Sequence, residues 1–352
     1  LVPELDEEGC WTFTTDRDLK VVQLTDIHIG GGAMSKDKDA KALNAVAAML
    51  TAEKPDLVVL TGDMVYPVPF QAGTFNNDIS TRMLITLMEK LGVYYTVCFG
   101  NHDSEFYATH DRKHVSDLWG DDSLKYSLYQ EGPADVDGYG NHVIKVKNSD
   151  GIITNAYYMF DSHEYTDGDV LGIMWKYDNI HENQIEWYKN SVLSIDAQNK
   201  AIDPDCEMFS SLAFFHIPLE EYQIAWDEFK ANGYKDTENV KYYDGWFHED
   251  GEQSYHGVYP ENLFETMLEL GSTKGMFCGH DHVNNAILEY KGIKLVYGMS
   301  IDYLAYTNLN SEGAQRGCTV INLTQDGELS VSLENYYQDK YPSQYEKEDI
   351  TM

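Results

Sequence analysis

Short apolar runs alternate with helical stretches in the first part of the chain, and this alternation limits the possible folds more than any other feature. The apolar runs are residues 19–25, 56–61 and 93–99, and helical spacing covers residues 37–54 and 80–91. Strands that alternate with helices indicate βαβ units and a parallel sheet. Each run ends in polar residues, and ligands of open α/β sheets bind outside the carboxyl ends of the strands. We therefore expect these polar residues to meet at one edge of a sheet.

The remainder of the chain is typical of further strands, with helices at residues 183–193 and 262–270 and a long surface loop at residues 232–257. The expected strands are residues 126–129, 142–146, 153–160, 209–215, 275–278, 287–290, 294–297, 319–322 and 329–333. No short repeat and no clean linker interrupts the chain. The chain is therefore predicted to form one two-sheet domain at residues 19–335. An N-terminal extension or edge strand at 1–18 precedes the domain, and an acidic C-terminal tail at 336–352 follows it.

The charge balance excludes one broad class of function. The 352 residues contain 59 Asp and Glu against 25 Lys and Arg, which gives a formal net charge of −34. Such a surface repels polyanions, so we expect no general nucleic-acid binding. A phosphate substrate would need a local positive source, which bound metal ions can supply. No apolar run approaches about 18 residues, so we expect no membrane-spanning helix in this chain.

The cysteines and the first residue bear on the compartment. The 5 cysteines are odd in number and widely spread, which does not fit a disulfide framework. Free thiols are compatible with the cytoplasm. The chain opens at Leu1 rather than Met, which indicates a removed signal peptide, membrane anchor or tag. We expect an extracytoplasmic protein, secreted or anchored, and keep the cytoplasm as the alternative.

Polar clusters that directly follow apolar strands predict a metal site. They are Asp26-Ile27-His28, Gly62-Asp63, Gly100-Asn101-His102-Asp103, His216, and Gly279-His280-Asp281-His282. Carboxylate, imidazole and amide oxygen together suit Mn, Fe, Zn or similar ions. Alternate residues of an extended segment point the same way, so we expect Asp26 and His28 to present their side chains together. A single strand-terminal Asp or a lone His is most often structural, so the prediction rests on the whole set.

The order of these clusters resembles the calcineurin-like metallophosphoesterase family, whose pattern is D-x-H, G-D, G-N-H-D/E, a single H and G-H-x-H. Residues 216–222 and 262–284 resemble more specifically the purple-acid-phosphatase-like branch, and the likeness covers nearly all of the chain after Leu19. The resemblance implies an α/β fold, a four-layer α/β/β/α sandwich with mixed sheets. It also implies two divalent metal ions at the strand ends.

The resemblance further implies a role for each matched residue. The implied metal ligands are Asp26, His28 and His282 for the first ion, Asp63 as the bridge, and Asn101, His216 and His280 for the second ion. His102 matches the histidine that contacts the substrate phosphate and assists the leaving group. Asp103 matches the acidic residue that orients this histidine.

Several residues near the motifs have roles that the sequence leaves open. Tyr66 stands where true purple acid phosphatases have an iron-binding tyrosine, but those enzymes lack a histidine at the position of His28, so we expect a packing aromatic. Arg112 could bind a phosphate oxygen or form a surface salt bridge. The aromatic-rich loop 232–257 could cap the site or simply pack on the surface. Four further histidines could line a substrate pocket: His163, His181, His248 and His256.

These observations predict a binuclear metal-dependent phosphoesterase that hydrolyses phosphate esters by in-line attack of a metal-bridging hydroxide. A phosphomonoesterase is the first expectation, because the resembling branch contains acid phosphatases. A phosphodiesterase on the same metal core is one alternative. A non-catalytic metal- or ligand-binding surface protein is another.

Overall fold

The computed structural model describes residues 1–350, and the strands within them form two sheets with the orders β1-β2-β6-β7-β8-β10-β12-β11-β9 and β14-β13-β3-β4-β5. The strands of the larger sheet are β1 (Glu4–Leu5), β2 (Trp11–Thr14), β6 (His142–Lys147), β7 (Ile153–Met159), β8 (Ser210–Phe214), β9 (Val240–Asp244), β10 (Thr273–Cys278), β11 (Ile287–Tyr290) and β12 (Ile293–Tyr297). Those of the smaller sheet are β3 (Leu19–Leu24), β4 (Leu57–Thr61), β5 (Tyr94–Cys98), β13 (Gly317–Leu323) and β14 (Leu329–Asn335).

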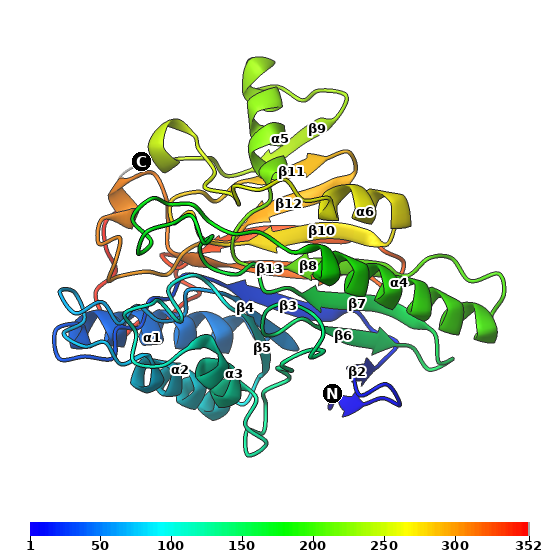
Figure 1. Ribbon diagram of the computed structural model, residues 1–352, viewed down its shortest axis with the longest axis horizontal. Coiled ribbons are helices and arrows are strands. Elements are labelled where there is room, and N and C mark those ends of the chain that lie inside the picture. The colour runs from blue at the N-terminus through cyan, green and yellow to red at the C-terminus, as the bar shows by residue number, and fades with distance from the viewer. Residues whose placement is uncertain (351–352) are drawn as a thin grey trace.

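Helices cover the outer face of each sheet (Figure 1). Those on the smaller sheet are α1 (Lys36–Glu53), α2 (Asn77–Leu91) and α3 (Arg112–Trp119), and those on the larger sheet are α4 (Glu182–Ile202), α5 (Glu220–Ala231) and α6 (Leu263–Leu270). Helix α2 shows how such an element starts and stops, because the Asn76 side chain accepts the Asp78 and Ile79 N–H groups and Gly92 ends the helix at φ 68°.

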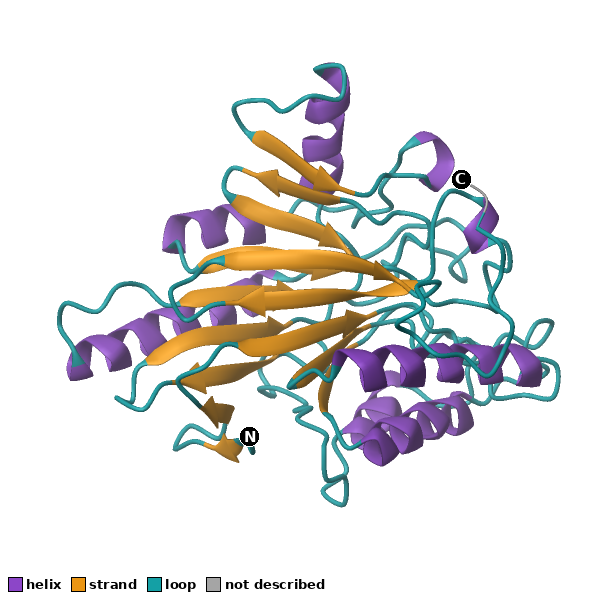
Figure 2. Cartoon of the chain, turned by 180° about the vertical axis from the view of Figure 1, so that it is seen from behind, coloured by secondary structure: helices purple, strands orange, loops and turns teal. Residues whose placement is uncertain are grey.

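Apolar side chains divide between three cores because successive residues of a strand point to opposite faces. Val21 and Val59 of the smaller sheet share one core with Tyr157 and Phe214 of the larger sheet. Val22, which follows Val21, lies instead in the core beneath α1, α2 and α3. A third core lies between the larger sheet and its helices. The layers are therefore helix, sheet, sheet and helix, as expected, and Figure 2 shows the stacked strands between helices.

The pairing of the strands is mixed in both sheets and directs their carboxyl ends to one edge. Strands β3, β4 and β5 pair in parallel, whereas β13 runs antiparallel to β3. In the larger sheet, β8 pairs in parallel with β7 and β10. The two sheets are joined near this edge, where the Gln23 side-chain amide donates to the Cys278 carbonyl oxygen at 2.9 Å. The turns after β3, β4, β5, β8 and β10 therefore meet.

Some elements differ from the sequence-based expectation. Residues 126–129 are not a strand: Ser127 makes a single bridge to Tyr95. The expected loop 232–257 contains strand β9 at the edge of the larger sheet, paired with β11. Helices α3 and α5 were not predicted, although Asp111 marks the start of α3, where its side chain accepts the His114 N–H. Helix α4 continues beyond residue 193 because Ile195 and Asn199 are buried.

The two ends of the described chain contact the same layers as the rest. Strand β2 pairs in parallel with β6, and Tyr336 and Tyr341 are buried in the core on the helix side of the smaller sheet. The division at residues 18 and 335 stays a prediction. Among residues 1–350, the helices lack the combination of length and apolar character that crossing a bilayer requires.

Candidate metal centre

The turns after the strands hold their residues in an unusual backbone conformation. Asp26, His28, Asp63 and His280 have φ values of 49°, 54°, 51° and 77°. The expectation that Asp26 and His28 lie on an extended segment is therefore wrong, because the chain turns sharply at both residues. Hydrogen bonds between turns hold this conformation, from Asp26 N–H to the Gly62 carbonyl at 3.0 Å and from His28 N–H to the Asp63 carbonyl at 3.1 Å. Such strain concentrates at functional sites.

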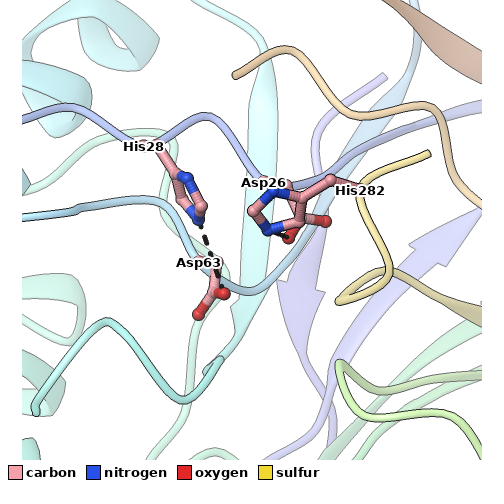
Figure 3. A group of neighbouring side chains, drawn as sticks. All are labelled: Asp26, His28, Asp63 and His282. Carbon is pink, nitrogen blue, oxygen red and sulfur yellow. Dashed lines mark ion pairs between the residues drawn. The ribbon is translucent and has the colours of Figure 1, made fainter. Parts of the chain in front are cut away.

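A first cluster of side chains consists of Asp26, His28, Asp63 and His282, whose candidate ligand atoms lie within 4.8 Å of one another. His28 Nε2 is 3.5 Å from Asp63 Oδ2, and His282 Nε2 is 3.3 Å from Asp26 Oδ1. Figure 3 shows that His28 points toward Asp63 while His282 lies beside Asp26. All of these side chains are buried. Both sheets contribute, because His282 follows β10 and the others follow β3 and β4.

A second cluster shares Asp63 with the first and adds His216 and His280. His216 Nε2 lies 3.1 Å from Asp63 Oδ2 and 3.3 Å from His280 Nδ1. The other ring nitrogen of His216 contacts the Thr61 carbonyl at 2.8 Å, which fixes the direction of the ring. Asp63 therefore lies at the junction of the two clusters.

Several buried ligand atoms of the clusters have no hydrogen-bond partner among the described residues. They include Asp26 Oδ1, His28 Nε2 and Asp63 Oδ2, and Asn101 Oδ1 of the turn after β5 is buried and unpartnered in the same way. The Asn101 amide nitrogen donates to the Tyr165 hydroxyl at 3.1 Å, which leaves its oxygen free. A buried polar atom without a partner is costly, and such a set of oxygen and nitrogen atoms is what a divalent cation requires. The donor set therefore fits two metal ions.

The pKa values of the clustered side chains are shifted because carboxylates and imidazoles lie close together away from water. Burial opposes ionisation of Asp63, but His216 and His102 hold the pKa of its carboxyl well below its usual range. Burial likewise opposes protonation of His28, yet Asp302 and Asp63 raise the pKa of its imidazole to about 9. The clusters thus stabilise a high density of opposite charges away from water.

Asp302 was missed by the sequence reasoning and contacts both histidines of the first cluster. Its Oδ2 lies 3.1 Å from His28 Nδ1 and 3.3 Å from His282 Nδ1. The same carboxylate accepts the N–H groups of Leu304 and Tyr306, which holds it in place. Carboxylates behind metal-binding histidines fix the ring orientation and the tautomer. The available signal was its place shortly after β12, the same strand-end position as the other clusters.

His102 faces the junction, but its acidic neighbour is not the predicted one. His102 Nε2 lies 3.9 Å from Asp63 Oδ2, and its Nδ1 lies 2.6 Å from Glu105 Oε1. The expectation that Asp103 orients His102 is corrected: the Asp103 carboxylate accepts the N–H groups of Gly100 at 2.7 Å and Asp63 at 3.0 Å. Asp103 therefore ties together the turns after β4 and β5, and Glu105 contacts the histidine.

Arg112 lies behind the junction rather than at a phosphate position. Its guanidinium contacts Asp161 at 2.5 Å, the Gly100 carbonyl at 2.6 Å and Glu164 at 2.9 Å. With most of its donors used, Arg112 braces the Gly100 turn. The salt bridge of the two expectations is present but is mostly buried rather than on the surface, and Arg112 is not among the residues that line the cavity described below.

Tyr66 is a packing aromatic, as expected. Its ring stacks on His28 with centroids 4.9 Å apart and an interplanar angle of 20°. Burial raises the pKa of its hydroxyl to about 12, with a further contribution from Asp302. The stacking restricts rotation of the His28 ring.

A cavity of about 290 Å³ opens above the junction. It is lined by Asp63, His102, Glu105, Tyr107, Tyr165, Leu171, Gly172, Trp175, Tyr177, Glu249, Asp250, Tyr255, His280, Asp281, His282 and Tyr306. The four further histidines whose role the sequence left open, His163, His181, His248 and His256, are not among these residues. Part of the loop 232–257 does line the cavity, while Tyr242 and Trp246 of the same loop pack against the core on α5. The segment around residues 165–177 was not predicted to contribute.

The fold and the paired clusters define a class of protein: an α/β sandwich with two adjoining metal-binding sites where its sheets meet. A family model described as "Calcineurin-like phosphoesterase" matches residues 19–284. The chain belongs to the calcineurin-like phosphoesterase family. Membership implies a binuclear centre of divalent metal ions and a phosphoester substrate.

Individual relatives carry different functional names. "Probable inactive purple acid phosphatase 14" of Arabidopsis thaliana is 26% identical over 325 residues, which cover 84% of this chain and 73% of that protein. "Phosphatase DCR2" of Saccharomyces cerevisiae is 28% identical over 304 residues, covering 78% and 46%. A solved structure of a dimetal phosphatase from Danio rerio has a TM-score of 0.49 and 11% identity, covering 91% of this chain and 100% of that one.

Proposed function

We propose that the chain is an active metal-dependent phosphomonoesterase. The observation that carries the proposal is the clustering of buried ligand atoms from Asp26, His28, His216, His280 and His282 around Asp63. Two divalent ions held there would neutralise the charge of a phosphate and activate water for attack on phosphorus. The proposed ligands are Asp26, His28 and His282 for one ion, Asp63 for both, and Asn101, His216 and His280 for the other. Mn, Fe and Zn all suit this set.

His102 is proposed to act on the substrate itself. It is the most exposed of the clustered histidines, with 23% of its side chain accessible, and it lines the cavity. From this position a proton on Nε2 can stabilise charge on a phosphate oxygen and pass to the leaving oxygen. Glu105, in contact with Nδ1, would keep the ring oriented for this transfer.

Catalysis is favoured over a binding role by the completeness of the machinery. The two relatives differ in name: the plant relative is called "probable inactive", whereas the yeast relative is called a phosphatase. In this chain every motif that matches a metal ligand is present, and the carboxylate and imidazole ligands lie together in the two clusters. An extracytoplasmic location stays a prediction, to be checked by fractionating cells that make the protein.

The test is turnover of 4-nitrophenyl phosphate and bis(4-nitrophenyl) phosphate by protein loaded with Mn²⁺. We expect preferred turnover of the monoester. Asp63→Asn should lower this turnover by about a thousandfold or more, because several kcal/mol of charge stabilisation are lost. Asp121→Asn, at an exposed position after α3, is the matched control and should change nothing. Faster turnover of the diester would mean that the protein is a phosphodiesterase rather than a phosphomonoesterase. Full activity of Asp63→Asn would refute the metal-based proposal.

A further inference from the structure

Among the described residues, the wall of the cavity above the junction carries no lysine or arginine, and its only basic side chains are the histidines at its base. Carboxylates and aromatic rings are frequent among the residues that line it. The metal ions would neutralise the phosphate at the base of the cavity, so the wall faces the other part of the ester. A wall of this composition repels a second anionic group and favours a positively charged one.

Most carboxylates of the wall already have partners within the protein. Glu105 contacts His102 and accepts the Tyr165 hydroxyl at 3.1 Å. Asp281 accepts the Tyr297 hydroxyl at 2.5 Å and the backbone N–H of Tyr255 at 3.1 Å. These carboxylates are therefore occupied in holding the site together.

The two remaining carboxylates of the wall, Asp250 and Glu249, differ in exposure. Asp250 is exposed and accepts the Tyr255 hydroxyl at 2.6 Å. Glu249 is only 7% exposed, and its Oε2 is buried without a hydrogen-bond partner among the described residues. Its Oε1 accepts the Tyr306 hydroxyl at 3.1 Å. Burial raises the pKa of Glu249, against the lowering influence of His282, the Tyr306 hydroxyl and the Val283 amide. Glu249 therefore contributes a mostly buried carboxylate to the cavity wall, and its negative charge favours a positively charged group of a ligand over an anionic one.

Aromatic rings surround the space in front of Glu249. Tyr306 lies with its ring 4.3 Å from that of His282, so a single tyrosine separates Glu249 from the first cluster. Trp175 and Tyr255 meet edge to face at 6.1 Å. In Figure 1 the green segment after β7, the yellow-green segment after β9 and the orange segment after β12 gather at the same end of the sheets. Rings of this kind attract organic cations through their electron-rich faces, most strongly where water is excluded.

From these features we propose that the cavity selects phosphoesters whose leaving alcohol carries a positive charge on a short linker, an aminoalkyl or quaternary ammonium group. The phosphate would sit at the junction, and the cation would lie against Glu249 among Tyr306, Tyr255 and Trp175. The proposal rests on the proposed function and adds the substrate class. It separates such esters from nucleoside phosphates, whose bases stack on the same rings but bring no positive charge.

The decisive comparison uses two esters of the same shape. Phosphocholine carries a quaternary ammonium, and 3,3-dimethylbutyl phosphate replaces that nitrogen by neutral carbon. We expect kcat/KM of the Mn²⁺-loaded enzyme to be about tenfold or more higher for phosphocholine. Glu249→Gln should lower the ratio of the two kcat/KM values. The control Glu238→Gln, at an exposed position before β9, should leave this ratio unchanged. Equal kcat/KM for the two esters would overturn the substrate class while leaving the phosphoesterase in place.

A binding measurement keeps the proposal independent of turnover. Choline and 3,3-dimethylbutanol are titrated into the Mn²⁺-loaded wild-type protein and followed by calorimetry and by the fluorescence of tryptophan. Choline should bind about tenfold or more tightly than the neutral alcohol, and its affinity should fall in Glu249→Gln. Equal affinities would overturn the inference. If choline binds more tightly than the neutral alcohol but no phosphoester is hydrolysed, the proposed function is refuted and the cation site is supported.

Discussion

The base of the cavity and its outer wall come from different kinds of backbone. The base consists of short turns that directly follow strands of both sheets, and its residues Asp26, Asp63 and His216 are wholly buried. The wall comes from longer segments, in which Leu171 and Trp175 are 56% and 61% exposed. The base has little freedom to change, because neighbouring turns fill the space around it. The wall can vary in side chain and length while the chemistry below it is kept. This contrast predicts where substitutions abolish activity and where they alter selectivity.

Glycine substitutions should show the largest difference in activity between the base and the wall. A Cβ at Gly100 would lie 2.1 Å from Asp63 Oδ1 and 2.4 Å from Asp63 N, whereas at Gly168, in the segment that supplies Tyr165 and Trp175 to the wall without itself lining the cavity, the nearest atom is 3.7 Å away. We expect Gly100→Ala to lower kcat/KM by about a hundredfold or more through displacement of Asp63. Gly168→Ala should change it less than about twofold. Steady-state kinetics and calorimetric Mn²⁺ titration of both variants test this, and an unaffected Gly100→Ala would show that the base is more adaptable than described.

Removing the carboxylate behind the histidines should have the next largest effect. Asp302→Asn keeps the size of the side chain but removes the charge that faces His28 and His282. The expected result is a ten- to hundredfold weaker affinity for Mn²⁺, about the usual effect of losing such a partner. The control is Asp250→Asn in the wall, which should bind Mn²⁺ as the wild type does. Unchanged Mn²⁺ affinity in Asp302→Asn would remove this residue from the metal centre.

Glu105 tests whether contact with His102 matters to the reaction rather than to the metals. Glu105→Gln should lower kcat for 4-nitrophenyl phosphate by about tenfold, because the histidine loses its orienting partner. Mn²⁺ affinity should stay the same, which a general structural defect would not allow. Glu164→Gln removes a neighbouring carboxylate that contacts Arg112 instead and is the matched control. Loss of Mn²⁺ binding in Glu105→Gln would instead place this residue in the metal centre.

Two histidines should contribute to stability with opposite dependence on pH. Burial lowers the pKa of His142 to about 4, so the unfolded chain binds more protons between pH 4 and 6.5, and stability rises with pH there by at most about 1.4 kcal/mol per unit. Hydrogen bonding to Asp178 raises the pKa of His181 to about 9, so its smaller, partly exposed contribution is lost between pH 6.5 and 9. Urea unfolding across pH should show a flatter low-pH slope for His142→Asn. His181→Asn should alter only the upper range, and the reverse pattern would contradict both assignments.

Much of the base could be predicted from the sequence, and the reason is local. Residues such as Asp26, His28 and His280 follow apolar strands directly, so the end of each strand fixes where they lie. Their left-handed backbone was not predictable from alternation, since it depends on hydrogen bonds between turns that are distant in the sequence. Asp302 was missed because it stands alone after β12, without a neighbouring histidine or glycine to mark it.

The wall escaped prediction for a different reason. Residues 163–177 have no period of helix or strand, and their positions depend on contacts such as that of the Tyr165 hydroxyl with Glu105. Glu105 illustrates the same limit, because Asp103 is adjacent to His102 in the sequence and Glu105 is three residues away, yet Glu105 makes the contact. The path of the turn determines which carboxylate contacts His102: the Asp103 carboxylate faces backbone N–H groups, and the Glu105 carboxylate faces the His102 ring.

The hydrogen bond from His280 N–H to Asp26 Oδ2, 3.1 Å long, has a consequence for how the protein is made. These residues come from opposite ends of the domain, so closing this contact requires one of the longest loops in the chain. During synthesis the strands that carry Asp26, Asp63 and Asn101 emerge well before those that carry His280, His282 and Asp302. A nascent chain therefore exposes half of a cation-binding site to the cell before the other half exists. The complete set of candidate ligands exists only once the two sheets have joined, so the full site would bind metal late in biogenesis.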